Sequence, residues 1–262
     1  MMKAYVMSLG RLTMPRASIT GDGGDLIKIP IWAVLVHHPD GLILYDTGIN
    51  IFDKDLITPK YWNPVDGIFE CTPEENIITR LRQIDVSPED IKYVVVSHLH
   101  ADHEGNIHRF PNAKVVVSDR EFTMLLKEYG QGRFLESHGC PQRTEFFAKS
   151  GIQWKLIDEE VLQLAEGVTL YQFGMGHSFS MLCMLLELPK TGAVFLCSDA
   201  IYTSENIGPP ISPPKNLRSR EGYIETLKHI QDIARDKNAV LWYGHDACFF
   251  EGLTKSTEGF YD

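Results

Sequence analysis

The sequence lacks the features that mark membrane proteins, secreted proteins and nucleic-acid binders. No apolar run approaches the ~18 residues that a membrane span needs, and residues 1–6 do not begin the apolar segment of a signal peptide. No block rich in Lys and Arg occurs, and the net charge of -10 disfavours contact with a phosphate backbone. We therefore expect a cytoplasmic protein with no membrane partner and no nucleic-acid partner.

Cysteine is scarce and unpatterned. The five cysteines form an odd number, and they show neither a CxxC pair nor zinc-finger spacing. Both a disulfide framework and a cysteine-based zinc site are therefore disfavoured. Reduced thiols with structural roles in a cytosolic protein are the simplest interpretation.

The chain does have enough apolar sequence for a full core, since 44% of its 262 residues are hydrophobic. Helical spacing of apolar residues predicts helices over 72–84, 119–129 and 220–235. Hairpins are mixed with strands that helices separate. This mixture predicts an αββα sandwich of two mixed β-sheets with outer helices. The length allows one large α/β domain or two small ones, and we expect a single domain over residues 1–262. Short apolar or β-branched runs predict the strands, over 31–36, 42–45, 93–97, 114–117, 168–173, 181–188, 194–197 and 240–243.

The most concentrated chemical signal is the segment 98–103, which reads His-Leu-His-Ala-Asp-His directly after an expected buried strand. Imidazole and carboxylate are ligands that zinc and similar divalent metals accept. In an extended segment His98 and His100 point to the same side, because side chains alternate. The turn that follows can bring Asp102 and His103 to a second metal, which predicts a metallohydrolase.

Three further polar residues follow expected strands, as the cluster does. His177 comes after 168–173, Asp199 after 194–197 and His245 after 240–243. Each taken singly is more often a capping, hydrogen-bonded or solvated residue than a ligand. Two metals, however, need more ligands than residues 98–103 supply. We therefore expect loops at one sheet edge to bring these residues together.

Taken together, these residues resemble the HxHxDH, His, Asp, His pattern of the metallo-β-lactamase superfamily. The segment 44–48, Leu-Tyr-Asp-Thr-Gly, is similar to the superfamily strand whose buried Asp supports the metal site. Within the superfamily the chain resembles the quorum-quenching N-acyl homoserine lactonases over nearly its whole length. The segment 199–203, Asp-Ala-Ile-Tyr-Thr, carries that resemblance most specifically.

The resemblance implies an enzyme that opens the lactone ring of N-acyl homoserine lactones through a hydroxide shared by two divalent metal ions. Zinc is the favoured metal, with iron, manganese and cobalt as alternatives. Tyr202 would polarise the lactone carbonyl, and Asp102 could carry a proton to the leaving alkoxide. The implied ligands are His98, His100 and His177 for one metal, Asp102, His103 and His245 for the other, and Asp199 as the bridge.

Other interpretations stay open. A pyridoxolactonase-like enzyme would share the metals and the tyrosine, and a glyoxalase II-like thioesterase of the same fold would not need Tyr202. The partner is a small lactone, and a homodimer is possible. The acyl tail of the substrate needs an apolar groove, for which position alone suggests Met14, Ile68, Phe69, Phe134 and Phe179.

Overall fold

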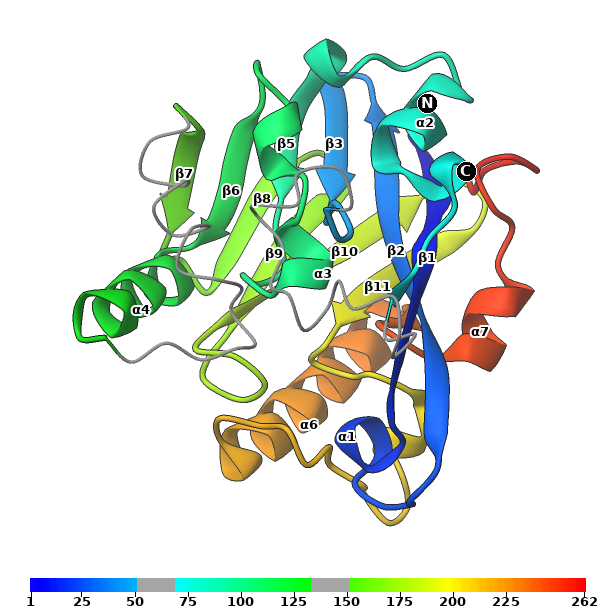
Figure 1. The fold of residues 1–262 in the computed structure, drawn as a ribbon. Coiled ribbons are helices and arrows are strands. Elements are labelled where there is room, and N and C mark those ends of the chain that lie inside the picture. The colour runs from blue at the N-terminus through cyan, green and yellow to red at the C-terminus, as the bar shows by residue number, and fades with distance from the viewer. Residues whose placement is uncertain (51–68, 133–150) are drawn as a thin grey trace.

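The computed structural model describes residues 1–50, 69–132 and 151–262. Its strands form a seven-stranded sheet in the order β4-β1-β2-β3-β5-β6-β7 and a five-stranded sheet in the order β12-β11-β10-β9-β8 (Figure 1). Both sheets contain parallel and antiparallel pairs. The strands of the first sheet are β1 (Lys3–Pro15), β2 (Leu26–His38), β3 (Gly41–Tyr45), β4 (Phe69–Glu70), β5 (Ile91–Val95), β6 (Lys114–Ser118) and β7 (Gln153–Ile157). Those of the second are β8 (Val161–Ala165), β9 (Val168–Phe173), β10 (Met181–Leu188), β11 (Gly192–Ser198) and β12 (Val240–Tyr243).

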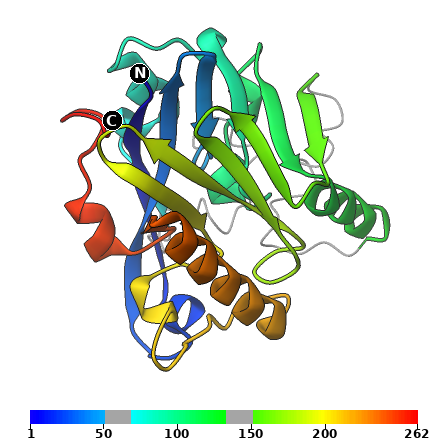
Figure 2. The ribbon, with the colours of Figure 1, turned by 180° about the vertical axis from the view of Figure 1, so that it is seen from behind.

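Helices cover the outer faces of both sheets. On the first sheet, α2 (Ile77–Arg82) and α4 (Asp119–Gly130) contribute buried leucines to one core. On the second, α6 (Arg220–Lys237) packs against the outer face, as Figure 2 shows from behind. The other α-helices among the described residues are short: α1 (Ala17–Thr20), α3 (Ala101–Glu104) and α7 (Ala247–Gly252).

The alternation of side chains explains the layers. In β2, Ala33 and Leu35 face the helices, while Val34 and Val36 face the second sheet. A third core lies between the second sheet and α6, where Tyr223 is fully buried. Apolar residues therefore occupy both of the alternating sets of strand positions, and both faces of each sheet are buried. The predicted αββα sandwich of two mixed sheets is confirmed.

One predicted helix is wrong in its extent. The stretch 72–84 forms a 3-10 turn, Pro73–Glu75, followed by the short helix α2. Asn76 separates them with an extended backbone, and its side chain accepts hydrogen bonds from the backbone N–H groups of Ile78 and Thr79. This cap begins a new helix, because a capping residue has a non-helical backbone.

None of the helices in the described part of the chain combines the length and the apolar character that crossing a membrane requires. The strand ends matter more for function. The carboxyl ends of β9, β11 and β12 share one edge of the second sheet, because β9 and β11 both run antiparallel to β10 and β12 runs parallel to β11. Loops from this edge meet the loops that follow β3 and β5 of the first sheet.

Candidate metal centre

Four predicted residues form a first ligand group: His98, His100, His177 and Asp199. His177 Nε2 lies 3.1 Å from His98 Nε2 and 2.8 Å from His100 Nδ1. His98 Nε2 and His100 Nδ1 are themselves 2.8 Å apart. Three imidazole nitrogens thus converge on one point, although His177 is 79 residues from His98. The structure brings together the histidines that the strand-end argument expected to meet.

A second ligand group consists of Asp102, His103 and His245. Asp102 Oδ2 lies 3.5 Å from His103 Nε2 and 3.7 Å from His245 Nε2. Asp102 and His103 belong to the first turn of α3, which begins directly after His100. The helical turn redirects the chain, so neighbouring residues of one short motif serve two groups.

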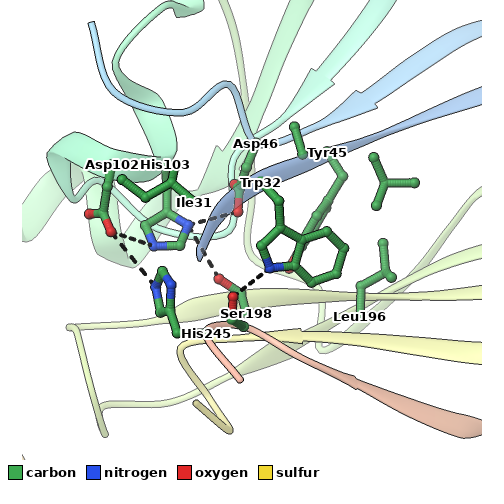
Figure 3. Close-up of a pocket in the computed structure, with 12 residues that line it drawn as sticks. Ile31, Trp32, Tyr45, Asp46, Asp102, His103, Leu196, Ser198 and His245 are labelled. Carbon is green, nitrogen blue, oxygen red and sulfur yellow. Dashed lines mark hydrogen bonds and ion pairs between the residues drawn. The ribbon is translucent and has the colours of Figure 1, made fainter. Parts of the chain in front are cut away.

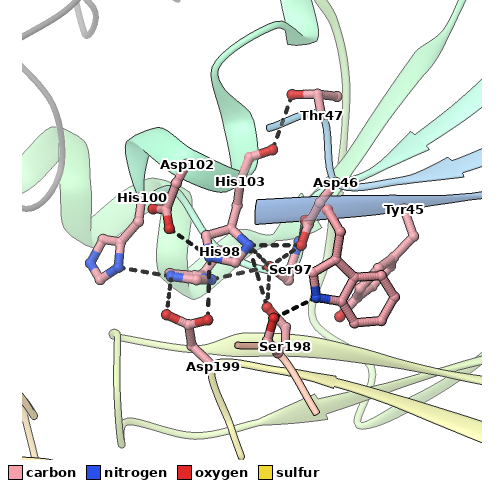
Figure 4. A network of polar contacts seen from close by, with 12 residues as sticks. Tyr45, Asp46, Thr47, Ser97, His98, His100, Asp102, His103, Ser198 and Asp199 are labelled. Carbon is pink, nitrogen blue, oxygen red and sulfur yellow. Dashed lines mark hydrogen bonds and ion pairs between the residues drawn. The ribbon is translucent and has the colours of Figure 1, made fainter. Parts of the chain in front are cut away.

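Asp199 lies between the two groups, and each of its oxygens faces a different one (Figure 4). Asp199 Oδ2 is 3.1 Å from His177 Nε2 in the first group. Asp199 Oδ1 is 2.9 Å from His245 Nε2 and 3.3 Å from His103 Nε2 in the second. A carboxylate in this position can bridge two cations.

Two observations indicate that the two ligand groups suit metal ions: buried ligand atoms that lack well-formed hydrogen bonds, and the chemical type of the donors. Asp199 Oδ1 and His103 Nε2 are buried, and among the described residues they face only each other and the other ligand atoms, without a well-formed hydrogen bond. Buried polar atoms normally have hydrogen-bond partners. The donors are imidazole nitrogens and carboxylate oxygens, a set that zinc and related divalent ions accept. The arrangement suits two divalent cations.

A polar network holds His103 from behind (Figure 4). His103 Nδ1 lies 2.8 Å from Asp46 Oδ2, which also accepts a hydrogen bond from Ser97 Oγ at 2.9 Å. Asp46 Oδ1 accepts the Ser97 backbone N–H at 2.8 Å, and Ser198 Oγ donates to Ser97 Oγ at 2.9 Å. With Nδ1 bound to a carboxylate, His103 presents Nε2 to the site. Asp46, the Asp of segment 44–48, thus contacts a predicted ligand, while its support of a metal site stays a prediction.

The other histidine of the second group is oriented by the main chain. His245 Nδ1 lies 2.8 Å from the carbonyl oxygen of Pro30, in β2. His245 N–H donates to the carbonyl of Tyr202 at 2.8 Å, which joins the loops after β12 and β11. The Tyr202 ring stacks on His245 at 5.5 Å, and its hydroxyl lies 2.8 Å from His177 Nδ1. Tyr202 therefore touches one histidine of each group.

The two groups differ electrostatically. Burial lowers the pKa of His177 to about 4, so its imidazole is neutral, as a ligand must be. Burial alone would lower the pKa of His103 too, but Asp102, Asp199 and Asp46 raise it well above its usual value. The carboxylates around His103 therefore favour a positive charge at the second group, either a proton on the imidazole or a bound cation.

The loop that carries His177 needs glycine to lie where it does. A Cβ on Gly222, at the start of α6, would stand 1.9 Å from the carbonyl oxygen of Met175. A Cβ on Gly176 would lie 3.1 Å from the backbone of Tyr223. The loop that carries His177 thus packs directly on the backbone of α6. This contact fixes the distance of the loop from the second sheet.

A cavity of about 20 Å³ lies between the sheets, behind His103 and His245 (Figure 3). Its lining includes Trp32 and Leu196. This space holds one water at most, so it is not a substrate pocket. Of the suggested groove residues, Ile68 and Phe134 lie outside the described residues, whereas Phe179 is buried beneath the Arg218 guanidinium.

Every predicted site residue lies at this centre, but their roles as ligands and catalytic groups stay predictions. Sequence reasoning missed Ser97, Ser198 and Glu121, which contact the ligands or the backbone between them. The spacing Ser118-x-x-Glu121 indicates a capping box at a helix start and gives no sign of a metal site.

Comparison with known proteins places these observations in a family. The family model of the metallo-beta-lactamase superfamily matches residues 27–245. The chain is 36% identical to the N-acyl homoserine lactonase AiiB of Rhizobium rhizogenes over 99% of both chains. It is also similar, with a TM-score of 0.80 and 25% identity over 99% of this chain and 98% of the other, to a solved N-acyl homoserine lactone hydrolase with the product N-hexanoyl-L-homoserine bound at its metal center.

The structure of AidC, a dizinc quorum-quenching lactonase, shares the fold with a TM-score of 0.73. The identity of 18%, over all of this chain and 94% of AidC, supports the fold alone. The predicted lactonase resemblance is confirmed by the relatives that match over full length. The chain belongs to the metallo-beta-lactamase superfamily, within its branch of N-acyl homoserine lactonases.

Proposed function

We propose that the protein is a metal-dependent hydrolase that opens the lactone ring of N-acyl homoserine lactones. The observation that carries the proposal is the pair of ligand groups joined by Asp199, with the Tyr202 hydroxyl beside them. The full-length similarity to AiiB supports the same substrate class.

His98, His100 and His177 would hold the first ion, and Asp102, His103 and His245 the second, with Asp199 shared between them. Zinc is favoured, because the donors are nitrogen and oxygen and the structurally similar AidC is a dizinc enzyme. Two bound ions supply a water of lowered pKa and a Lewis acid for the lactone carbonyl.

The Tyr202 hydroxyl is placed to donate a hydrogen bond. If His177 binds through Nε2, its Nδ1 carries the hydrogen and donates to the Tyr202 oxygen at 2.8 Å. The tyrosine hydroxyl hydrogen then remains available for the lactone carbonyl oxygen. Donors aimed at a developing oxyanion stabilise the tetrahedral transition state.

Asp102 is the carboxylate with access to the substrate side. Its side chain is 19% exposed, against 4% for Asp199. A carboxylate at the edge of the centre can accept the proton of the attacking water and return it to the ring oxygen as the ester bond breaks. Asp102 would thus serve both as ligand and as proton carrier.

The substitution Tyr202→Phe tests the proposed role of the hydroxyl. We expect kcat for N-acyl homoserine lactones to fall about 10²–10³-fold, which is typical for the loss of one oxyanion donor. Metal content should stay at the native level. Tyr171→Phe, which alters a partly buried tyrosine of β9 away from the centre, is the matched control. Unchanged turnover in Tyr202→Phe with metal retained would show that the ring only packs.

A substrate panel separates the related activities. Turnover of N-acyl homoserine lactones, pyridoxolactone and glutathione thioesters should be compared before chelation, after it and after metal is restored. We expect the acyl homoserine lactones to be the best substrates. A preference for either of the other two would replace the proposed substrate with that of the rival enzyme.

The proposal includes a cytoplasmic location and a homodimer. The cysteines that the structure describes are all free thiols, as a reducing compartment requires. Light scattering of the metal-loaded protein tests the homodimer, since a monomer mass would exclude it.

A further inference from the structure

Glu121 is the third residue of α4, and its side chain is fully buried. Its backbone N–H donates to Ser118 Oγ at 3.4 Å, which is one half of a capping box. In a complete box the carboxylate would fold back to the N-cap backbone N–H. Here both carboxylate oxygens point to other segments, so the side chain does more than begin the helix.

The two oxygens join the backbone segments that carry the first ligand group. Glu121 Oε1 accepts the Leu99 N–H at 3.1 Å, and Leu99 lies between His98 and His100. Oε2 accepts the N–H groups of Phe179 at 2.9 Å and Ser180 at 3.1 Å, just after His177. One carboxylate therefore spans the two loops that supply the imidazoles of this group.

The chemistry of a carboxylate suits this task. An ionised carboxylate accepts several N–H groups at once, and such charge-assisted bonds are stronger than neutral ones. The N-terminus of α4 favours the negative charge, as does the guanidinium of Arg218, which lies over the Phe179 ring. A glutamine has one acceptor oxygen only, and its amide nitrogen would face an N–H donor.

We propose that Glu121 is a positioning residue that sets the distance between the His98–His100 segment and the His177 loop, and with it the metal affinity of the first group. The second group does not depend on it, because Asp46 and the Pro30 carbonyl orient His103 and His245. The inference rests on the metal-dependent function proposed above.

The test is Glu121→Gln, followed by stepwise Zn²⁺ binding in competition with a chromogenic chelator. We expect one of the two ions to bind about 10–100-fold more weakly, as for other groups that orient ligands from behind. The other ion should keep its native affinity. Asp119→Asn is the matched control, because it removes a charge from the same helical turn without touching either loop.

Two further variants identify the ion and guard against misfolding. In a His103→Ala background only the first group is intact, so Glu121→Gln should weaken the single remaining ion by the same factor. Glu121→Asp keeps the charge but shortens its reach, so it should weaken the same ion by a smaller factor. If Glu121→Gln does not fold, Glu121→Asp decides by the same titration.

The outcomes are distinct. Native affinity for both ions in Glu121→Gln, or equal weakening of both, would overturn the positioning role. A native protein that binds no ions would instead overturn the proposed function itself. Selective weakening of one ion, with the Asp119→Asn control unchanged, is the expected result, and a general loss of stability would not produce it.

Discussion

The two ligand groups share Asp199 but are held in place by different means. In the first, His98, His100 and His177 depend on the backbone spacing of two loops. In the second, the Nδ1 atoms of His103 and His245 are fixed by direct hydrogen bonds to Asp46 and the Pro30 carbonyl. His98 Nδ1 and His177 Nδ1 also have hydroxyl neighbours, Ser97 and Tyr202. The first group differs in that one carboxylate joins its two loops, so it is the more sensitive to loop position.

The groups also differ in charge and access. Three imidazoles dominate the first group, and they are at most 8% exposed. The second contains Asp102, whose side chain is 19% exposed. The first group is therefore suited to hold an ion firmly, whereas the second offers an open edge where a substrate and a proton carrier can meet.

The largest effect should come from substituting Asp199, the residue that the two ligand groups share. Asp199→Ala deletes the carboxylate that faces both groups, so we expect both ions to be lost and lactone turnover to fall to the level of the chelated native protein. Metal analysis and a lactone assay measure this. Asp232→Ala, an exposed carboxylate on α6, should change neither. Full retention of one ion in Asp199→Ala would show that Asp199 serves a single group.

Asp46→Asn should weaken metal binding by the second ligand group, as Glu121→Gln should weaken it in the first. It disturbs the hydrogen bond that orients His103, so we expect one ion to bind about 10–100-fold more weakly. The backbone should tolerate the change, because Asp46 has φ 60° and asparagine adopts the left-handed region readily. Combined with Glu121→Gln, the variant should weaken both ions. Weakening of the same ion by both single variants, in chelator titrations, would contradict the comparison.

Gly222→Ala tests the dependence of the first group on loop position. The new Cβ would meet the Met175 carbonyl at 1.9 Å, so the His177 loop has to move. We expect a loss of about 1–3 kcal/mol in the free energy of unfolding, typical of overpacking, together with weaker binding of the first ion. Urea unfolding of the metal-free protein measures the former. Gly130→Ala, at the end of α4 with open space around it, is the control, and an equal loss there would refute the explanation.

The sequence could predict most of the site because its signals are local. The spacing from His98 to His103 is readable within one segment, and His177, Asp199 and His245 each follow an apolar strand. The fold was predictable for the same reason, since alternation and helical spacing are local patterns. The ends of parallel strands then bring distant residues to one edge.

What the sequence could not show depends on contacts between distant backbones. Glu121 accepts N–H groups of residues 22 and 58 positions away, and a backbone donor leaves no mark in the sequence. Strand β1 was missed because Ser8, Gly10 and Arg11 interrupt its apolar pattern, at the place where its register with β2 shifts. Such bulges follow from pairing with the neighbouring strand rather than from local preference.

The smallest effect concerns the charge of Glu121. Burial raises its pKa to about 6, from the ordinary 4.5, against the opposing effect of its hydrogen bonds and Arg218. The folded protein therefore binds this proton more tightly than the unfolded chain, so the group makes stability rise as pH falls through 6 towards 4.5. A difference of about 1.5 pKa units corresponds to about 2 kcal/mol.

The direction of this pH dependence gives a test that does not involve metal binding. In the metal-free proteins, the unfolding free energy of the native chain minus that of Glu121→Gln should rise by about 2 kcal/mol between pH 7.5 and pH 4.5. A difference that does not change with pH would show that the carboxyl is not strained by burial. At neutral pH the ionised carboxylate thus costs folding free energy, which is the expected cost of a group kept for position rather than for stability.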